Sequence, residues 1–399
     1  MLWRVRAARL GACVLRIALF TPYSPEIGGG SAQLRSHLRD LTDLDIRWYY
    51  LAPKPAAVAN ENWKWIGARL SFGELISDLS ARSEVLAGSR SRVREIVRRI
   101  DADLFWVVGY YEGISVAAEL CAQGKPVHVT IHDDPFGTWR RSERYRWFQP
   151  LLRRTFPDLL RRARSVDVTS WGMRNLYREK YGVPCFSVYL HVPGLPALNV
   201  ARNIEEFTVG HIGTLYRLQP FRRFLEACKR IAAEENCRLR VVRIGNSPEL
   251  DGLVAANPEM FRSYGDLSEA AAIPLLAACD LQYAMYPAGQ KYELFRRTSL
   301  PIKLSTYVQA QRPIFAHSPQ DSGLARIVGP ARVGSVCSSE DESEIYRSIR
   351  ETLGNSYPFE AFETLRQELM GADQVEQLKI ALLGGQWRGL PEGDFRSNV

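Results

Sequence analysis

The residues best suited to chemistry in the first half of the chain follow a short apolar run. His132 and Asp133 come directly after 127–131, a run typical of a buried strand. An imidazole can hydrogen-bond a substrate hydroxyl, and a carboxylate can act as a base or orient another group. Open parallel sheets bind their ligands at the carboxyl ends of the strands. We therefore predict that His132 and Asp133 are catalytic. The alternative is a loop that caps the following helix.

Three consecutive glycines, Gly28, Gly29 and Gly30, separate an earlier apolar run from a helix expected to begin near Ser31. Glycine lets the backbone approach a ligand closely, and the free N–H groups of a helix start favour an anion. The order of residues is neither G-x-G-x-x-G nor a P-loop, because G-K-[ST] is missing. The loop predicts a phosphate nearby, and a flexible surface loop is the alternative.

A second glycine turn lies in the other half of the chain. A predicted strand ends at Gly213, and Thr214 begins a polar turn before the next helix. This turn could receive a diphosphate at the helix start, with Arg217 pairing its charge. A tight connection between a strand and a helix is the alternative.

A further helix start carries both hydroxyls and an ammonium group. Pro301 favours the start of a helix, and the first turn then contains Lys303, Ser305 and Thr306. These groups could converge on a phosphate or a ribose. The alternative for Lys303 is an ordinary solvated lysine.

The positive charge of the chain is concentrated in one segment. The net charge is +8, with +10 in residues 1–200 and −2 in residues 201–399. Residues 139–164 contain nine Arg and two acidic residues among aromatic side chains, which gives +7. The candidate contacts in and near this segment are Trp139, Arg140, Arg141, Trp147, Arg153 and Arg154. This pattern favours an anionic membrane surface or a lipid-phosphate acceptor, with a nucleic acid or a solvated face as alternatives.

The elements that must position these residues alternate between short apolar runs and amphipathic segments, which predicts parallel α/β sheets. Strands are expected at 14–20, 46–51, 104–108, 127–131, 165–169, 186–189, 208–212, 239–244, 281–285 and 313–316. Helices are expected to begin near residues 31, 84, 111, 143 and 171, and to span 221–234, 302–310, 341–353 and 359–383. A Pro/Gly-rich stretch that begins at His191 separates the two series. The pattern predicts two Rossmann-like domains.

Composition excludes several other classes of protein. The chain has 399 residues, 46% hydrophobic and 24% charged, which is not the composition of a disordered or fibrous protein. Its seven cysteines form no C-x-x-C pair, so neither a disulfide framework nor a zinc site is expected. The apolar runs are too short for a signal peptide or a membrane span. We expect a cytoplasmic protein, and contact with the inner face of the cell membrane stays open.

Taken together, these segments resemble the GT-B glycosyltransferases, in the large group of retaining enzymes that use nucleotide sugars. The resemblance covers about 15–383, through Pro22–Gly30, His132, Thr169–Pro184, Ile212–Thr214, Arg243–Gly245, Tyr264–Leu267 and Pro301–Ala316. It implies two domains that face each other across a cleft: an acceptor domain, 1–195, and a donor domain, 205–358. The remainder, 359–399, would close the fold by crossing back to the first domain.

The resemblance also implies roles for the site residues. Gly28 to Gly30 would lie near the diphosphate and acceptor, and His132 would contact the transferred sugar. Tyr264 would lie beside the nucleobase. The residues expected near the phosphates and ribose are Gly213, Thr214, Gly245, Lys303, Ser305, Thr306 and Tyr307. The partners implied are a nucleotide sugar and a lipid-linked or saccharide acceptor in bacterial cell-surface polysaccharide or glycolipid assembly, with no metal, cofactor or nucleic acid.

The chain departs from the group at its charged positions. Relatives carry an Arg directly after the glycine turn and a Lys soon after it, where this chain has Thr214 and Pro220. They also carry two Glu seven residues apart, at positions that correspond to Thr298 and Thr306. Four arginines could substitute as cations: Arg217, Arg222, Arg296 and Arg297. A binding protein without catalytic activity is therefore the alternative function.

Overall fold

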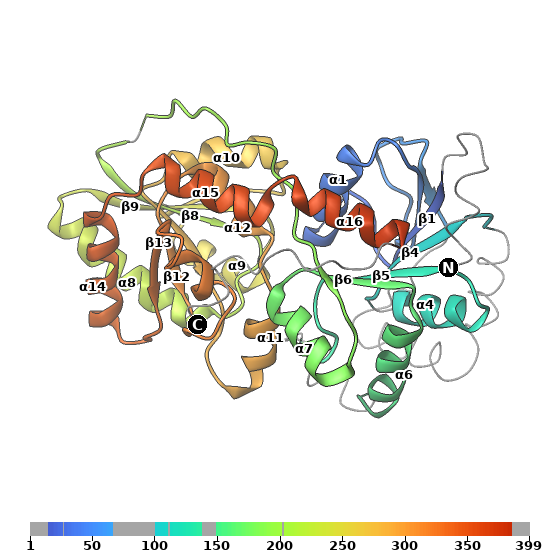
Figure 1. Ribbon diagram of the computed structural model, residues 1–399. Coiled ribbons are helices and arrows are strands. Elements are labelled where there is room, and N and C mark those ends of the chain that lie inside the picture. Colours follow the sequence, from blue (N-terminus) through green and yellow to red (C-terminus); the bar gives the residue numbers. More distant parts are fainter. Residues whose placement is uncertain are drawn as a thin grey trace.

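Two parallel β-sheets organise the chain, and each lies in its own lobe (Figure 1). The computed structural model describes residues 15–26, 28–66, 100–110, 112–137, 149–201 and 203–384, without the side chains of 149–151. The first sheet has the strand order β3-β2-β1-β4-β5-β6-β7. Its strands are β1 Arg16–Thr21, β2 Asp45–Tyr50, β3 Trp63–Trp65, β4 Leu104–Val108, β5 Val127–Ile131, β6 Ser165–Val168 and β7 Phe186–Ser187.

Helices flank this first sheet because its central strands must be shielded from water on both faces. Every residue of β4 and β5 is buried, which explains their uninterrupted apolar sequences. The described helices of this lobe are α1 Gly29–Asp40, α4 Glu112–Ala122, α6 Gln149–Arg162 and α7 Trp171–Tyr181. The helices expected to begin near residues 84 and 143 start outside the described residues.

The second sheet has the order β10-β9-β8-β11-β12-β13. Its strands are β8 Glu206–Ile212, β9 Arg238–Ile244, β10 Phe261–Tyr264, β11 Leu281–Met285, β12 Ile314–His317 and β13 Gly334–Cys337. Its helical elements are α8 Leu218–Glu234, α9 Pro248–Ala256, α10 Glu269–Ala277, η1 Gln290–Tyr292, α11 Glu293–Thr298, α12 Lys303–Ala310, α13 Ala325–Val328 and α14 Glu342–Gly354. The prediction of parallel α/β sheets is confirmed, although it omitted the edge strands β3, β10 and β13.

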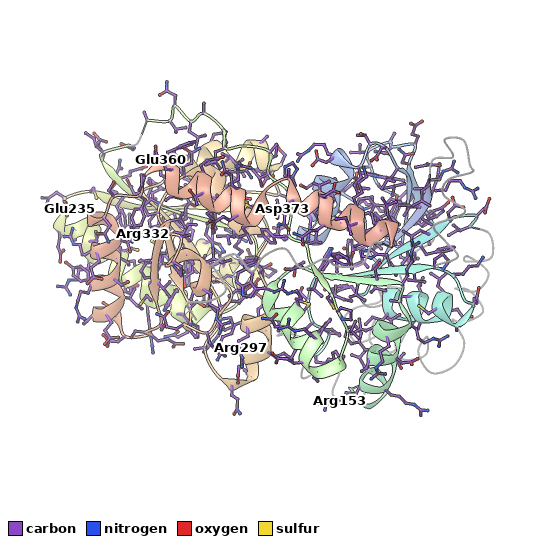
Figure 2. All side chains as sticks on the ribbon, viewed as in Figure 1. Arg153, Glu235, Arg297, Arg332, Glu360 and Asp373 are labelled. Atoms are coloured by element: carbon purple, nitrogen blue, oxygen red, sulfur yellow. The ribbon has the colours of Figure 1, made fainter. Side chains whose placement is uncertain are left out.

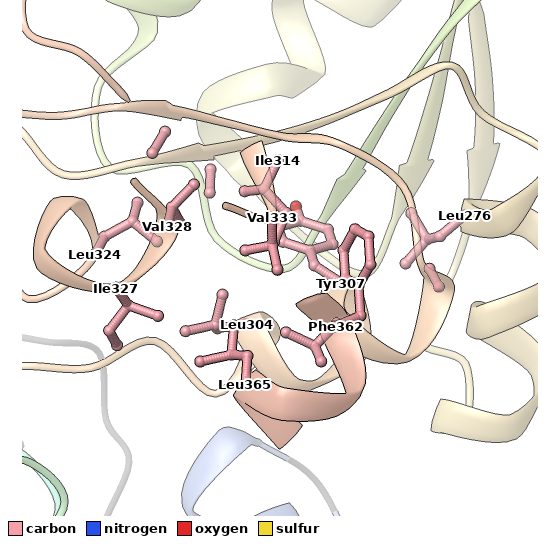
Figure 3. Close-up of a cluster of buried hydrophobic side chains, with 14 of the residues drawn as sticks. Leu276, Leu304, Tyr307, Ile314, Leu324, Ile327, Val328, Val333, Phe362 and Leu365 are labelled. Carbon is pink, nitrogen blue, oxygen red and sulfur yellow. The ribbon is translucent and has the colours of Figure 1, made fainter. Parts of the chain in front are cut away.

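Helix α12 is anchored by its apolar face. Leu304 and Tyr307 are fully buried and share a core cluster with Phe362 and Leu365 of the helix α15, Phe359–Met370 (Figure 3). The Tyr307 hydroxyl also donates to the carbonyl of Tyr283, 2.8 Å away, and accepts from the N–H of Ile212 at 3.1 Å. This packing fixes the first turn of α12, which begins at Lys303.

The last described helices run from the second lobe to the first (Figure 1). Helix α16, Asp373–Leu383, packs against β6 and β7, and its Leu378 and Leu382 are buried in the core of the first sheet. The prediction of one helix over 359–383 is wrong, because α15 ends at Met370. Gly371 has an extended backbone, and a Cβ there would lie 2.3 Å from the Gln367 carbonyl oxygen. The chain therefore leaves the helix at Gly371 and begins a separate helix at Asp373.

Candidate active site

His132 follows β5 directly and packs against the glycine loop and the segment after β1. Its Nδ1 lies 3.2 Å from the hydroxyl of Tyr23, a residue just beyond the end of β1. A Cβ built on Gly30 would lie 2.6 Å from Nδ1 and 2.7 Å from that hydroxyl. Only a residue without a side chain fits at position 30, so the glycine is needed for close packing against the Tyr23–His132 pair.

Burial keeps both members of this pair uncharged. Removal from water lowers the pKa of His132 and raises the pKa of Tyr23 well above its ordinary value. The other ring nitrogen of His132, Nε2, is buried and has no hydrogen-bond partner among the described residues. A buried polar atom of this kind favours a ligand or a water as its partner. His132 can therefore hydrogen-bond a substrate while it stays neutral.

Asp133 faces the second domain. Its Oδ1 accepts a hydrogen bond from the Ser299 hydroxyl at 2.8 Å, across 166 residues of sequence. Ser299 lies between α11 and α12, close to the start of the helix that carries Lys303. This hydrogen bond connects the two domains through Asp133. The role of Asp133 as a base stays a prediction.

Lys303 extends from the start of α12 to the glycine turn after β8. Its Nζ donates to the carbonyl oxygen of Thr214 at 2.7 Å and lies 5.5 Å from the centre of the Tyr216 ring. No carboxylate of the described part of the chain forms an ion pair with it. Burial lowers the pKa of this ammonium group to about 7. A partly buried cation without a counter-charge is suited to bind an anion.

The glycine turn beside Lys303 leaves room for such an anion. Gly213 and Gly245 have φ angles of 73° and 81°, a backbone region that side chains other than glycine rarely adopt. At Gly213, only the Lys303 side chain lies within 4 Å of a Cβ position, at 3.8 Å. The two glycines also lie side by side, since a Cβ on Gly245 would be 3.5 Å from the Gly213 nitrogen. The sequence-predicted Gly213, Thr214, Gly245 and Lys303 thus come together.

The first domain's glycine loop reaches the same place. A Cβ on Gly29 would lie 3.4 Å from a side-chain carbon of Ile302, the residue before Lys303. The starts of α1 and α12 therefore lie against each other, although 273 residues separate Gly29 from Ile302. Gly28 is exposed at the N-cap of α1 with a φ of 100°. The glycines, His132 and Lys303 consequently surround one region between the domains.

The next turn of α12 binds a carboxylate that the sequence pattern did not single out. Ser305 and Thr306 are buried, and their hydroxyls lie 3.2 and 3.4 Å from Oε1 of Glu269. Tyr264, which ends β10, is partly exposed in the strand that leads toward Glu269. Tyr307 is fully buried with its hydroxyl bonded to the backbone, so it supports the site and does not line it.

The four arginines proposed as substitute cations differ in their surroundings. Arg217, at the N-cap of α8, lies 3.6 Å from a carboxylate oxygen of Glu340. Arg296 forms a two-pronged ion pair with Asp321, at 2.7 and 2.8 Å. Arg297 pairs with Glu293 at 2.9 Å, and Arg222 is exposed on α8. Since Arg217, Arg296 and Arg297 already have carboxylate partners, Lys303 is better placed to receive an anion.

The basic segment lies away from this region where the structure describes it. Arg153 and Arg154 are exposed on α6, and Arg153 is labelled at the lower edge of the first lobe (Figure 2). Trp139, Arg140, Arg141 and Trp147 lie outside the described residues. Within the described ranges, no cluster of His, Cys, Asp or Glu is arranged to hold a metal ion. Over those ranges, every helix is too short or too polar to cross a bilayer.

Sequence reasoning overlooked Tyr23, Ser299 and Glu269. Tyr23 stands in the same loop as the predicted glycines, so its place directly after a strand was an available signal. Ser299 lies two residues before Pro301, again inside a recognised segment. Glu269 had no local signal except a helix start, because its partners on α12 lie 36 to 40 residues later.

The sequence of the first domain and the fold of the whole chain are similar to known proteins. Residues 27–191, most of the first domain, match the sequence model of Glycosyltransferase Family 4. The fold is similar to that of sucrose-phosphate synthase from Thermosynechococcus elongatus, with a TM-score of 0.65 at 14% identity. That alignment covers 92% of this chain and 98% of the synthase. The chain therefore has the GT-B fold, and the family match indicates a glycosyltransferase.

Two further solved structures have the same architecture. The lipopolysaccharide outer core galactosyltransferase WaaB matches with a TM-score of 0.59 at 9% identity, over 92% of this chain and 99% of WaaB. Anabaena HepE, solved in complex with UDP, matches with a TM-score of 0.57 at 15% identity and the same coverages. No curated protein is significantly similar in sequence. The glycosyltransferase assignment thus depends on the family match and the fold, and it does not favour the alternative of a binding protein without activity.

Proposed function

We propose that this GT-B glycosyltransferase uses a nucleoside diphosphate sugar as donor and a hydroxyl of a lipid-linked or saccharide molecule as acceptor. The acceptor oxygen forms a bond to the anomeric carbon of the sugar while the bond from that carbon to the diphosphate breaks. The acceptor proton passes to the released diphosphate. Positioning and charge stabilisation then account for catalysis without a bound metal or cofactor.

The ammonium group of Lys303 is the observation that carries this proposal. It lies at the meeting point of two glycine turns and two helix starts, with no carboxylate partner among the described residues. The departing diphosphate develops negative charge, and a fixed cation stabilises it most effectively in a site that excludes water. Lys303 therefore supplies the charge for which the relatives use residues at the positions of Thr214 and Pro220.

The acceptor side of the proposal depends on the first domain. His132 presents a buried, unpartnered Nε2 beside the glycine loop and can hydrogen-bond the transferred sugar. A role in bacterial cell-surface polysaccharide or glycolipid assembly is supported by the likeness to WaaB, although the fold alone carries that likeness. Exposed arginines on α6 favour a peripheral position at the inner face of the membrane.

The test compares Lys303→Met with the unchanged protein. Purified protein is incubated with UDP-, GDP-, ADP- and CDP-linked sugars, and binding and release of the nucleoside diphosphate are measured. We expect one donor class to bind, and we expect Lys303→Met to slow sugar transfer or donor hydrolysis by about 10²- to 10³-fold, as for loss of one charge-stabilising donor.

Lys229→Met is the matched control, because Lys229 is an exposed lysine of α8 that pairs with Glu226. We expect this change to leave binding and turnover unaltered. Binding of none of the donors by the unchanged protein would overturn the proposal. Full activity of Lys303→Met would overturn the role of the lysine and leave sugar transfer intact.

A further inference from the structure

Glu269 is an exposed carboxylate that helix α12 holds in a fixed position. Its Oε1 accepts hydrogen bonds from Gln309 Nε2 at 2.7 Å and from the hydroxyls of Ser305 and Thr306 at 3.2 and 3.4 Å. All three donors are buried side chains on one face of α12. No hydrogen bond from the described residues reaches the second oxygen, Oε2. The carboxylate is therefore oriented by one oxygen, and the other is available to a ligand.

The position of this carboxylate follows from helix geometry. Lys303 and Thr306 are three residues apart, so they lie on the same side of α12, about one 5.4 Å turn from each other. Glu269 contacts the Thr306 side, and Lys303 contacts the glycine turn at Gly213. A ligand that binds Lys303 through an anionic group would meet Glu269 with the part of the ligand that lies about one helical turn away from that group.

In a nucleoside diphosphate, the group at that separation from the phosphates is the ribose. Its 2′ and 3′ hydroxyls are hydrogen-bond donors, and a carboxylate is an acceptor with two oxygens. We propose that Glu269 binds the ribose hydroxyls of the donor through Oε2 and so selects a nucleotide with an intact diol. This inference rests on the proposed function, because it requires a nucleotide with its phosphates at Lys303.

A purely structural role for Glu269 makes a different prediction. Its bonds to Gln309 and Ser305 also join α10 to α12, so loss of the carboxylate could simply loosen the two helices. A loosened site would weaken the binding of every nucleotide by the same factor. If the carboxylate binds the ribose, its loss weakens only the binding of nucleotides that carry the hydroxyl. The ratio of two affinities therefore separates the two roles.

The experiment measures by calorimetry the dissociation constants of UDP, GDP, ADP and CDP. It then measures those of the 2′-deoxy and 3′-deoxy forms of the nucleotide that binds best. We expect the unchanged protein to bind the ribonucleotide about tenfold or more tightly than at least one deoxy form, the range for a hydrogen bond to a charged group. Glu269→Gln should reduce that ratio to less than about threefold.

The matched control is Glu342→Gln. Glu342 is the exposed first residue of α14, just as Glu269 is the exposed first residue of α10. It should leave the ratio unchanged, and thermal melting should show that both variants are folded. If Glu269→Gln proves unstable, Thr306→Val removes one orienting donor instead and should reduce the ratio in part.

Three outcomes keep this inference distinct from the proposed function. Equal affinity of the unchanged protein for the ribo- and deoxynucleotides would overturn the role of Glu269 and leave sugar transfer standing. An undiminished ratio in Glu269→Gln would do the same. Failure of the unchanged protein to bind any of the four nucleotides would overturn the proposed function itself.

Discussion

At the scale of single residues, burial sets the chemistry of both principal side chains. Lys303 and His132 each lose water around an ionisable group, and the pKa of each is lowered for that reason. The consequences differ. A neutral imidazole remains a good partner for sugar hydroxyls, whereas an ammonium group with a pKa of about 7 must be protonated to bind a diphosphate. The two residues therefore predict different dependences on pH.

Nucleotide binding should weaken as the pH rises above 7. The free Lys303 has a pKa of about 7, and a bound diphosphate raises that pKa, so binding takes up a proton above pH 7. We expect the dissociation constant for a nucleoside diphosphate to increase by up to about tenfold per pH unit between pH 7 and 9. Calorimetry in two buffers of different ionisation heat measures this uptake directly. A slope that survives in Lys303→Met would contradict the prediction.

The same lowered pKa has a consequence for stability without ligand. Between pH 7 and 10.5 the unfolded lysine binds a proton that the folded lysine has lost. Because the unfolded state then binds more protons, the free energy of unfolding increases with pH over this range. Urea titrations of the unchanged protein and Lys303→Met should show that the variant lacks this increment.

Tyr23 should act on catalysis through His132. The protonated phenol is expected to donate to Nδ1, which places the ring hydrogen on Nε2, toward the substrate. Tyr23→Phe removes this constraint, and we expect kcat to fall by about tenfold with little change in nucleotide affinity. Tyr49→Phe, a partly exposed tyrosine of β2, is the control. Equal losses of kcat and nucleotide affinity would instead indicate a packing defect.

At the scale of elements, helix α6 divides its two roles between its two faces. Phe156, Leu159 and Leu160 are buried in the core of the first sheet, while Arg153 and Arg154 are exposed. The apolar face therefore attaches the helix to the domain, and the two arginines lie on its exposed side. The prediction of membrane contact is untested by the fold and needs a direct experiment.

Neutralising this basic face should weaken binding to anionic membranes. For Arg153→Gln with Arg154→Gln, we expect about 30-fold weaker binding to phosphatidylglycerol vesicles, from about 1 kcal/mol per arginine. Nucleotide binding should be unchanged, because α6 lies away from α12, the helix that begins at Lys303 (Figure 1). The control is Arg238→Gln with Arg347→Gln, two exposed arginines of the second domain. If the two double variants bind vesicles equally well in a sedimentation assay, the α6 arginines do not contribute to membrane binding.

At the scale of the whole molecule, the site exists only when the two domains are docked. Helices α7 and α11 meet at their junction, where Arg297 is labelled (Figure 2). Ser170 donates to the carbonyl oxygen of Thr298, and Tyr189 donates to that of Pro301 at 2.7 Å. A Cβ on Gly172 would lie 2.2 Å from the Arg297 carbonyl oxygen. The approach of α7 to α11 therefore depends on this glycine.

Gly172→Ala should separate the domains and reduce sugar transfer. A methyl group at this position contacts backbone, which cannot move aside as a flexible side chain can. We expect a larger radius of gyration in X-ray scattering and a marked loss of activity, with nucleotide binding largely kept because Lys303 and Glu269 both belong to the second domain. Gly252→Ala, inside α9 with nothing within 4 Å of its Cβ position, should change neither quantity. An unchanged radius with full activity in Gly172→Ala would refute this view of docking.

The sequence by itself determined the features that local physics controls. Val127–Ile131 and Leu281–Met285 are strands with the predicted bounds, because a fully buried parallel strand requires an uninterrupted apolar run. The glycine loop and the helix start at Lys303 were equally visible, since backbone conformation there depends on neighbouring residues. Only the tertiary structure decided that Glu269 contacts α12 and that Asp133 meets Ser299. Such contacts join residues far apart in sequence through the packing of whole elements, and no local pattern of residues encodes them.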